Sequence, residues 1–85
     1  MILRRTNSFV KQFKRLTPRM QNQFTERLAL WLSDQSHPQL HVHILHGAYA
    51  GYWSFNVSGD IRAIYTFEGD TVVVFAFIGT HSKLY

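Results

Sequence analysis

The sequence contains no cysteine, which excludes a disulfide-stabilised scaffold, a thiolate zinc site and a cysteine nucleophile. No apolar run approaches the ~20 residues that a membrane-spanning helix needs. The first five residues, Met-Ile-Leu-Arg-Arg, lack the apolar core of a signal peptide. We therefore expect a cytoplasmic protein without a membrane partner. With 85 residues, 46% of them apolar, the chain is expected to form one folded domain over residues 1–85.

Acidic residues are also scarce, with five Asp and Glu against nine Lys and Arg and a net charge of +4. Six basic residues precede the first acid, Glu26: Arg4, Arg5, Lys11, Lys14, Arg15 and Arg19. A one-sided basic surface favours a polyanion or an acidic protein as partner. A solvated helix face that keeps the protein soluble explains the same charges equally well, so charge alone does not decide the function.

The N-terminal half of the sequence predicts two helices joined by a short connection. Asn7 or Ser8 is expected to cap the first helix. Thr17 is expected to cap the second, with Pro18 in its first turn and an end near Asp34. Each helix has one apolar face at helical spacing. These faces are Phe9, Val10, Phe13 and Leu16 in the first helix, and Met20, Phe24, Leu28, Trp31 and Leu32 in the second.

In the C-terminal half of the sequence, apolar and polar residues alternate with a period of two, which is typical of strands. Strands are expected around Val42 and Ile44 and over residues 52–57, 61–67 and 71–78, with Ile2 and Leu3 as a short first strand. Residues 72–78 are apolar on both faces, which predicts a strand covered on both sides. The predicted fold class is α+β, with two N-terminal helices packed on one face of a four- or five-stranded antiparallel sheet.

The register of the hairpin formed by the predicted strands 52–57 and 61–67 determines which polar residues lie opposite each other. A three-residue loop over residues 58–60 would place Val57 opposite Ile61 and Asn56 opposite Arg62. A two-residue loop would shift the register and separate Asn56 from Arg62. With the three-residue loop, the core face carries Phe55, Val57, Ile61, Ala63 and Tyr65, and the other face carries Ser54, Asn56, Arg62 and Ile64.

Five histidines occur in the sequence: His37, His41, His43, His46 and His81. A metal site needs three or four convergent ligands, and the lack of cysteine and of nearby acids disfavours one, so we predict neither a metal nor a cofactor. His41 and His46 are interpreted as exposed residues at strand ends. His43 and His81 have the near-neutral pKa that suits proton transfer, although an isolated histidine is more often structural.

Arg62 lies within a predicted inner strand, where its charge needs a partner. That partner is Asp60, Glu68 or a phosphate, whose geometry a guanidinium matches well. Histidine, aspartate and arginine together can cleave RNA without a metal, because a base takes the 2′-hydroxyl proton, an acid protonates the leaving 5′-oxygen and a cation stabilises the transition state. From spacing alone, this chemistry is one possibility among several.

Four segments, in this order and spacing, resemble the RelE/ParE toxin superfamily and its YafQ-like branch: His43-Ile44-Leu45-His46-Gly47, Gly51-Tyr52-Trp53-Ser54, Gly59-Asp60-Ile61-Arg62-Ala63-Ile64-Tyr65 and Ile78-Gly79-Thr80-His81. The resemblance covers essentially the whole chain. It implies a RelE-like α+β fold and the toxin half of a bacterial toxin–antitoxin pair. Many members of the superfamily cleave mRNA in the ribosomal A site without a metal.

The resemblance also implies roles for single residues. His43 and His81 match positions that transfer protons, Asp60 matches the acidic position, and Arg62 matches a basic position that binds the scissile phosphate. Which of His43, Asp60 and His81 is the acid and which the base stays open. The resemblance makes Tyr85 a candidate for stacking on a base.

Two further positions complete the predicted substrate contacts. Lys83 is a candidate phosphate contact. Asn56 stands where the YafQ-like branch often has another histidine, and Ile61 where that branch often has tryptophan. An asparagine can hydrogen-bond a phosphate or a 2′-hydroxyl but cannot shuttle a proton near neutral pH, so we expect Asn56 to bind substrate.

The expected function is a metal-independent endoribonuclease that cleaves mRNA on the 70S ribosome. The expected partners are mRNA, the ribosome, an acidic antitoxin that neutralises the toxin, and operator DNA reached through that antitoxin. One alternative is a ParE-like toxin that inhibits DNA gyrase, against which the terminal Gly-Thr-His argues because that branch generally lacks it. Another is a weak or inactive member that only binds antitoxin, which Asn56 favours.

Overall fold

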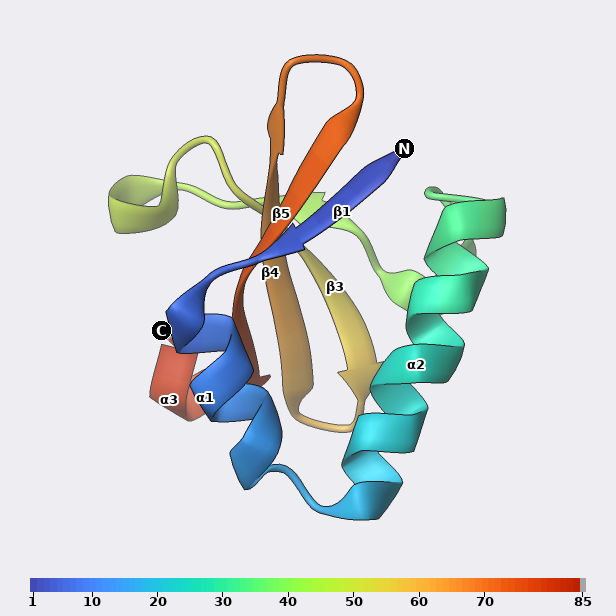
Figure 1. Cartoon of the computed structure of the whole chain (residues 1–85), viewed down its shortest axis with the longest axis vertical. Coiled ribbons are helices and arrows are strands. Elements are labelled where there is room, and N and C mark those ends of the chain that lie inside the picture. The colour runs from blue at the N-terminus through green and yellow to red at the C-terminus, as the bar shows by residue number, and fades with distance from the viewer. Residues whose placement is uncertain (85) are drawn as a thin grey trace.

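A computed structural model describes residues 1–84 of the chain (Figure 1). The elements follow in the order β1 (Ile2–Arg5), α1 (Asn7–Arg15), α2 (Pro18–Ser33), the 3₁₀ turn η1 (Pro38–Leu40), β2 (His43–Ile44), the 3₁₀ turn η2 (Gly47–Tyr49), β3 (Trp53–Ser58), β4 (Ile61–Glu68), β5 (Val72–Thr80) and α3 (His81–Leu84). The five strands form one sheet in the order β1-β5-β4-β3-β2. The predicted α+β class is confirmed.

The sheet is antiparallel except at one edge. The pairs β2–β3, β3–β4 and β4–β5 are antiparallel, but β1 runs parallel to β5, with Ile2 opposite Val72 and Arg5 opposite Phe75. The expectation of a wholly antiparallel sheet is therefore wrong for β1. Alternation along a strand tells which residues share a face and carries no information on the direction of a neighbour that is distant in the sequence.

The cap of α2 follows from local sequence, whereas the cap of α1 also depends on a tertiary contact. The Thr17 hydroxyl accepts from the Met20 amide at 3.2 Å and Pro18 begins α2, as predicted. The cap of α1 is Thr6, not Asn7 or Ser8: its hydroxyl accepts from the Phe9 amide at 3.0 Å. The same hydroxyl donates to the Ala76 carbonyl of β5 at 2.6 Å, a tertiary contact that the sequence does not reveal.

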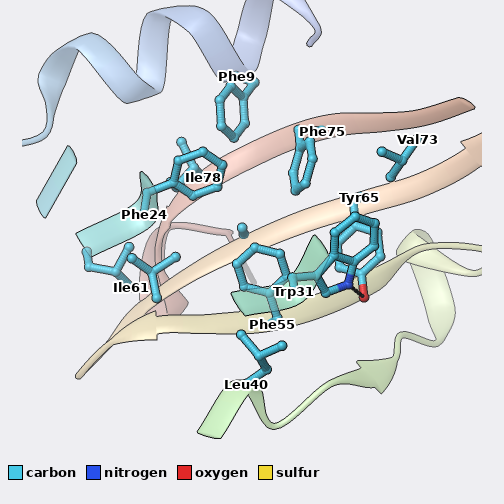
Figure 2. Packing of buried hydrophobic residues seen from close by; sticks show 12 residues of the cluster. Phe9, Phe24, Trp31, Leu40, Phe55, Ile61, Tyr65, Val73, Phe75 and Ile78 are labelled. Atoms are coloured by element: carbon cyan, nitrogen blue, oxygen red, sulfur yellow. Dashed lines mark hydrogen bonds between the residues drawn. The ribbon is translucent and has the colours of Figure 1, made fainter. Parts of the chain in front are cut away.

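An aromatic core lies between the sheet and the two long helices (Figure 2). Its buried aromatic residues are Phe9, Phe24, Trp31, Phe55, Tyr65 and Phe75. The Trp31 indole donates to the Tyr65 hydroxyl at 3.1 Å, which satisfies both polar groups inside the core (Figure 2). The predicted core face of β3 and β4 is confirmed, because Phe55, Val57, Ile61, Ala63 and Tyr65 all belong to this cluster.

A smaller hydrophobic cluster covers the opposite face of the sheet. Leu45, Ile64 and Leu84 form a second buried cluster, against which Tyr49, Tyr52 and Phe77 pack. These residues bring the η2 loop and α3 onto the sheet face that α1 and α2 leave uncovered. Strand β5 contributes Val73, Phe75 and Ile78 to the first cluster and Phe77 to the second, which confirms that it is covered on both sides.

In the β3–β4 hairpin, Asn56 pairs with Arg62 as predicted, but the turn is shorter than predicted. Its turn has two residues, Gly59 and Asp60, with Ser58 opposite Ile61, so the three-residue loop and the Val57–Ile61 pair are both wrong. Asn56 nevertheless lies opposite Arg62, because the register shifts between Asn56 and Ser58. The shift makes Val57 the extra residue of a β-bulge, which compensates for the shorter turn.

Candidate functional site

The β3–β4 turn and the start of α3 lie at the same end of the sheet (Figure 1). The backbone amide of His81 donates to the Asp60 carbonyl at 3.0 Å. Arg62 lies between Asn56 on β3 and Gly79 on β5 in the strand register. The fold therefore brings Asn56, Asp60, Arg62 and His81 together from the ends of three adjacent strands.

Arg62 is the half-buried cation of this cluster. Its Nη1 donates to the Gly59 carbonyl at 2.8 Å and to the Ile61 carbonyl at 3.3 Å. Neither of the expected carboxylates pairs with it: Glu68 pairs with Arg4 at 3.1 Å, and no ion pair of Arg62 occurs in residues 1–84. The backbone thus orients a guanidinium whose charge no carboxylate of the described chain neutralises, an arrangement suited to binding an anion.

His81 and Lys83 are exposed residues of α3. The Thr80 hydroxyl accepts from the Lys83 amide at 3.3 Å and so caps this short helix. Leu84 anchors its other end, with its side chain buried against the sheet and its carbonyl accepting from the Tyr49 hydroxyl at 2.7 Å. Since α3 is a single helical turn, these contacts determine where His81 stands.

His43 lies on the same face of the sheet but farther away. It sits on the edge strand β2 opposite Ser54, and from strand spacing its Cα is about 12 Å from that of Arg62. Its ring Nδ1 lies 2.9 Å from the His41 carbonyl oxygen, which leaves Nε2 directed elsewhere. The structure therefore gathers four predicted site residues at one end of the sheet and places His43 at the margin of that group.

Sequence reasoning missed two features beside this cluster. A groove of about 600 Å³ runs between the α1–α2 connection and α3, with the cations Arg15 and Lys83 on its walls and Ile61 and Ile78 among its apolar lining. Ser54 is fully buried, and its hydroxyl has no hydrogen-bond partner within the described chain. Both features depend on how distant elements pack, although the cluster of basic residues before Glu26 already indicated one groove wall.

The remaining histidines do not converge. The His37 ring nitrogen accepts from the Gln39 amide at 3.1 Å, and His41 ends the η1 turn in a left-handed conformation with a φ of 48°. His41 and His46 are both exposed, as expected. Over residues 1–84, no group of three or more metal-ligating side chains could hold an ion. No helix in that part is long and apolar enough to cross a membrane. The predicted stacking residue Tyr85 lies outside the described residues.

Three solved toxin structures are similar to this chain. E. coli YafQ from strain BL21(DE3) is 24% identical over 98% of this chain and 96% of that chain, with a TM-score of 0.78. A YoeB/ParE toxin from Agrobacterium tumefaciens is 21% identical over 95% and 99%, with a TM-score of 0.79. YafQ in the E. coli DinJ–YafQ toxin–antitoxin complex is 25% identical over 98% and 94%, with a TM-score of 0.74.

A search of curated protein sequences found no significant match. The family model described as a bacterial toxin of type II toxin–antitoxin systems, YafQ, matches residues 1–85. This match confirms the resemblance seen in the four sequence motifs, and the shared fold agrees with it. The chain belongs to the YafQ family of bacterial type II toxins.

Proposed function

We propose that this toxin is a metal-independent endoribonuclease that cleaves mRNA in the A site of the 70S ribosome. One observation carries the proposal: the sheet places Arg62 beside Asn56 and near Asp60 and His81. A cation with no carboxylate partner among residues 1–84, an amide, a carboxylate and an imidazole supply what phosphodiester cleavage needs.

The reaction consists of one displacement at phosphorus. A base, His81 or Asp60, takes the proton of the 2′-hydroxyl, and the 2′-oxygen attacks the adjacent phosphorus. The bond from phosphorus to the 5′-oxygen breaks, and the other group of the pair protonates that leaving oxygen. The products are a 2′,3′-cyclic phosphate and a 5′-hydroxyl. Arg62 stabilises the charge that develops on the phosphoryl oxygens, and Asn56 donates to the phosphate or binds the 2′-hydroxyl.

The remaining predicted residues act at the periphery. Lys83, exposed on α3 two residues after His81, contacts a neighbouring phosphate. His43 complements the acid–base pair only if the RNA spans the distance from β2 to β4. Tyr85, at the end of the chain, stacks on a base.

An acidic antitoxin neutralises the toxin in this proposal. The structure of the E. coli DinJ–YafQ toxin–antitoxin complex, together with the family match, supports an antitoxin as partner. Charge complementarity with the basic surface speeds capture, and a disordered antitoxin segment folds as it covers that surface. Operator DNA is bound through the antitoxin.

The test is primer extension on an mRNA in a translating extract, with the wild type, His81→Ala and His46→Ala. His46 is exposed on the η2 loop outside the cluster, so its variant controls for the loss of a surface histidine. We expect cuts in register with codons that disappear without ribosomes. His81→Ala should lower the rate by roughly 10²- to 10⁴-fold, and His46→Ala should leave it unchanged.

Two results would contradict the proposal. Cleavage by His81→Ala at the wild-type rate would remove His81 from the chemistry. A folded wild-type toxin that cuts no mRNA would favour the gyrase-inhibiting or inactive alternatives, and a DNA supercoiling assay would then separate those two.

A further inference from the structure

The bulge at Val57 decides which residue of β3 faces Arg62. Ser58 pairs with Ile61 across the two-residue turn, and the ladder resumes with Asn56 opposite Arg62. Without the extra residue, continuous pairing from the same turn would place Val57 opposite Arg62 and turn Asn56 toward the core. The polar pair at the centre of the site therefore exists only because this bulge is maintained.

Side chains of α2 hold the bulge from the other side of the sheet. The Arg27 Nε donates to the Val57 carbonyl at 3.0 Å, and its Nη1 donates to the Gln39 Oε1 of η1 at 3.1 Å. The next residue, Ser58, donates from its hydroxyl to the Gln23 Oε1 at 2.8 Å. Val57 is only 1% exposed, so a carbonyl displaced from the strand pairing needs a donor inside the protein.

Arg27 suits this position for geometric reasons. Its guanidinium is planar and has a fixed set of donors, so two bonds made at once fix both its place and the direction of the carbonyl. The Val57 side chain belongs to the core cluster under α2, whereas Asn56 and Arg62 lie on the opposite face. Arg27 thus contacts the bulge from the face of the sheet that α2 covers, not from the face on which RNA would lie.

The segment that follows the bulge carries the rest of the site. The Gly59 carbonyl accepts from Arg62, and the Asp60 carbonyl accepts from the His81 amide. A change in the path of β3 at Val57 would therefore be transmitted both to the guanidinium and to the start of α3.

We propose that Arg27 is a positioning residue for the cleavage reaction: by fixing the Val57 bulge it sets the alignment of Asn56, Arg62 and His81. The inference rests on the proposed function for its effect on rate. Its structural part, that Arg27 sets the surroundings of Asn56 and Arg62, can be measured without any cleavage assay.

The experiment compares the wild type with Arg27→Met, Arg27→Lys and Gln39→Ala in the full-length toxin. Arg27→Met keeps the aliphatic stem and removes every donor. Arg27→Lys keeps a cationic donor, and Gln39→Ala removes only the bond from Arg27 to the exposed Gln39 side chain. NMR spectra of the Asn56 side-chain amide and the Arg62 Nε–H report alignment, thermal unfolding reports stability, and ribosome-dependent cleavage gives kcat and KM.

In Arg27→Met we expect both NMR signals to shift and kcat to fall by roughly 10- to 100-fold, the size typical of a small misplacement of catalytic groups, while KM stays within about twofold. Arg27→Lys should give a smaller shift in the same direction and an intermediate kcat, because an ammonium cannot make both bonds in the directions of a guanidinium. Gln39→Ala should give the smallest shift of the three, because it removes one of the two Arg27 bonds and keeps the bond to the Val57 carbonyl.

Unshifted Asn56 and Arg62 signals in a folded Arg27→Met protein would overturn the proposal, as would a loss of rate that appears only in KM. If Arg27→Met does not fold, unshifted Asn56 and Arg62 signals in Arg27→Lys would overturn the proposal instead. A wild type that cleaves nothing would refute the proposed function alone, because the NMR comparison still tests whether Arg27 aligns the site.

Discussion

Asn56 is the residue at which this site departs from the pattern of the YafQ-like branch, which often has histidine there. It is half-buried, lies directly across from Arg62, and comes one residue before the bulge. An asparagine there can hydrogen-bond a phosphate or a 2′-hydroxyl, but it cannot transfer a proton near neutral pH, so the proposed reaction assigns proton transfer to His81 and Asp60.

Asn56→His should therefore increase cleavage. An imidazole in the same cross-strand position would add a group able to transfer protons near neutral pH beside Arg62, and we expect kcat to rise by about 10-fold or more. The measurement is single-turnover cleavage on programmed ribosomes from pH 6 to 8, with Asn22→His, at an exposed position of α2, as the control. A rate equal to that of the wild type would show that the position does not take part in proton transfer.

Tyr65 is a titratable residue inside the core. Burial raises the pKa of its hydroxyl above the ordinary value of 10.0, and the hydrogen bond from Trp31 lowers it only in part. Because the folded pKa is raised, the unfolded chain loses this proton first as the pH increases. The stability that depends on the protonated hydroxyl is thus fully present below the unfolded pKa and is lost as the pH rises through the folded one.

The alkaline stability should accordingly differ between the wild type and Tyr65→Phe. The free energy of unfolding of the wild type should fall more steeply as the pH rises above the ordinary value of 10.0. Near neutral pH, Tyr65→Phe should be less stable by about 1 kcal/mol, because the Trp31 indole loses its acceptor. Urea unfolding at several pH values measures both effects. Parallel pH profiles for the two proteins would contradict the assignment to Tyr65.

At the scale of elements, α3 is the part of the site with the least internal support. It is a four-residue helix, too short to be stable alone, and Leu84 attaches it to the sheet by its buried side chain and by its carbonyl bond to Tyr49. The η2 loop, which contributes Tyr49, is thus part of the scaffold that presents His81.

Tyr49→Phe removes the hydroxyl while keeping the aromatic packing on Phe77. We expect kcat to fall by roughly 10-fold, since His81 would be less well oriented, and carboxypeptidase to digest the C-terminus faster. Ala48, the exposed neighbour of Tyr49, offers a control in Ala48→Ser, which should change neither. Unaltered digestion and cleavage in Tyr49→Phe would show that α3 is held in place without the bond from the Tyr49 hydroxyl.

At the scale of the whole molecule, the basic charge is largely uncompensated. The Arg4–Glu68 ion pair joins two exposed side chains and contributes little to stability. The cations of α1 and of the start of α2, namely Lys11, Lys14, Arg15 and Arg19, are all exposed. They form a positive field that extends beyond the cluster of Asn56, Asp60, Arg62 and His81 and is available to steer an acidic partner.

Capture of the antitoxin should therefore depend on salt. The association rate constant with the cognate antitoxin should fall by about 10-fold or more between about 50 mM and 500 mM NaCl, while the dissociation rate changes much less. Stopped-flow fluorescence of the two tryptophans measures the association, and a neutral osmolyte at matched osmolality is the control. An association rate insensitive to salt would show that steering by charge is unimportant.

Much of this arrangement could be predicted from the sequence, because its causes are local. The apolar spacing predicted α1 and α2, the Thr17-Pro18 pair predicted the start of α2, and alternation predicted the faces of β3 and β4. Alternation placed Asn56 and Arg62 on one face of neighbouring strands, but their direct pairing was predicted from a three-residue loop that the structure does not have. The motifs also determined the family, since their order and spacing are properties of the chain itself.

The tertiary structure decided the features that depend on residues far apart in the chain. The direction of β1 follows from its pairing with β5, and the cap of α1 is set by a threonine that also bonds β5. Arg62 bonds backbone carbonyls, and Glu68 cannot reach it because six residues of strand, about 20 Å, separate the two along β4. The two-residue turn keeps Asn56 opposite Arg62 because a bulge at Val57 adds one residue to β3, and the Val57 carbonyl is bonded by Arg27, thirty positions earlier in the chain.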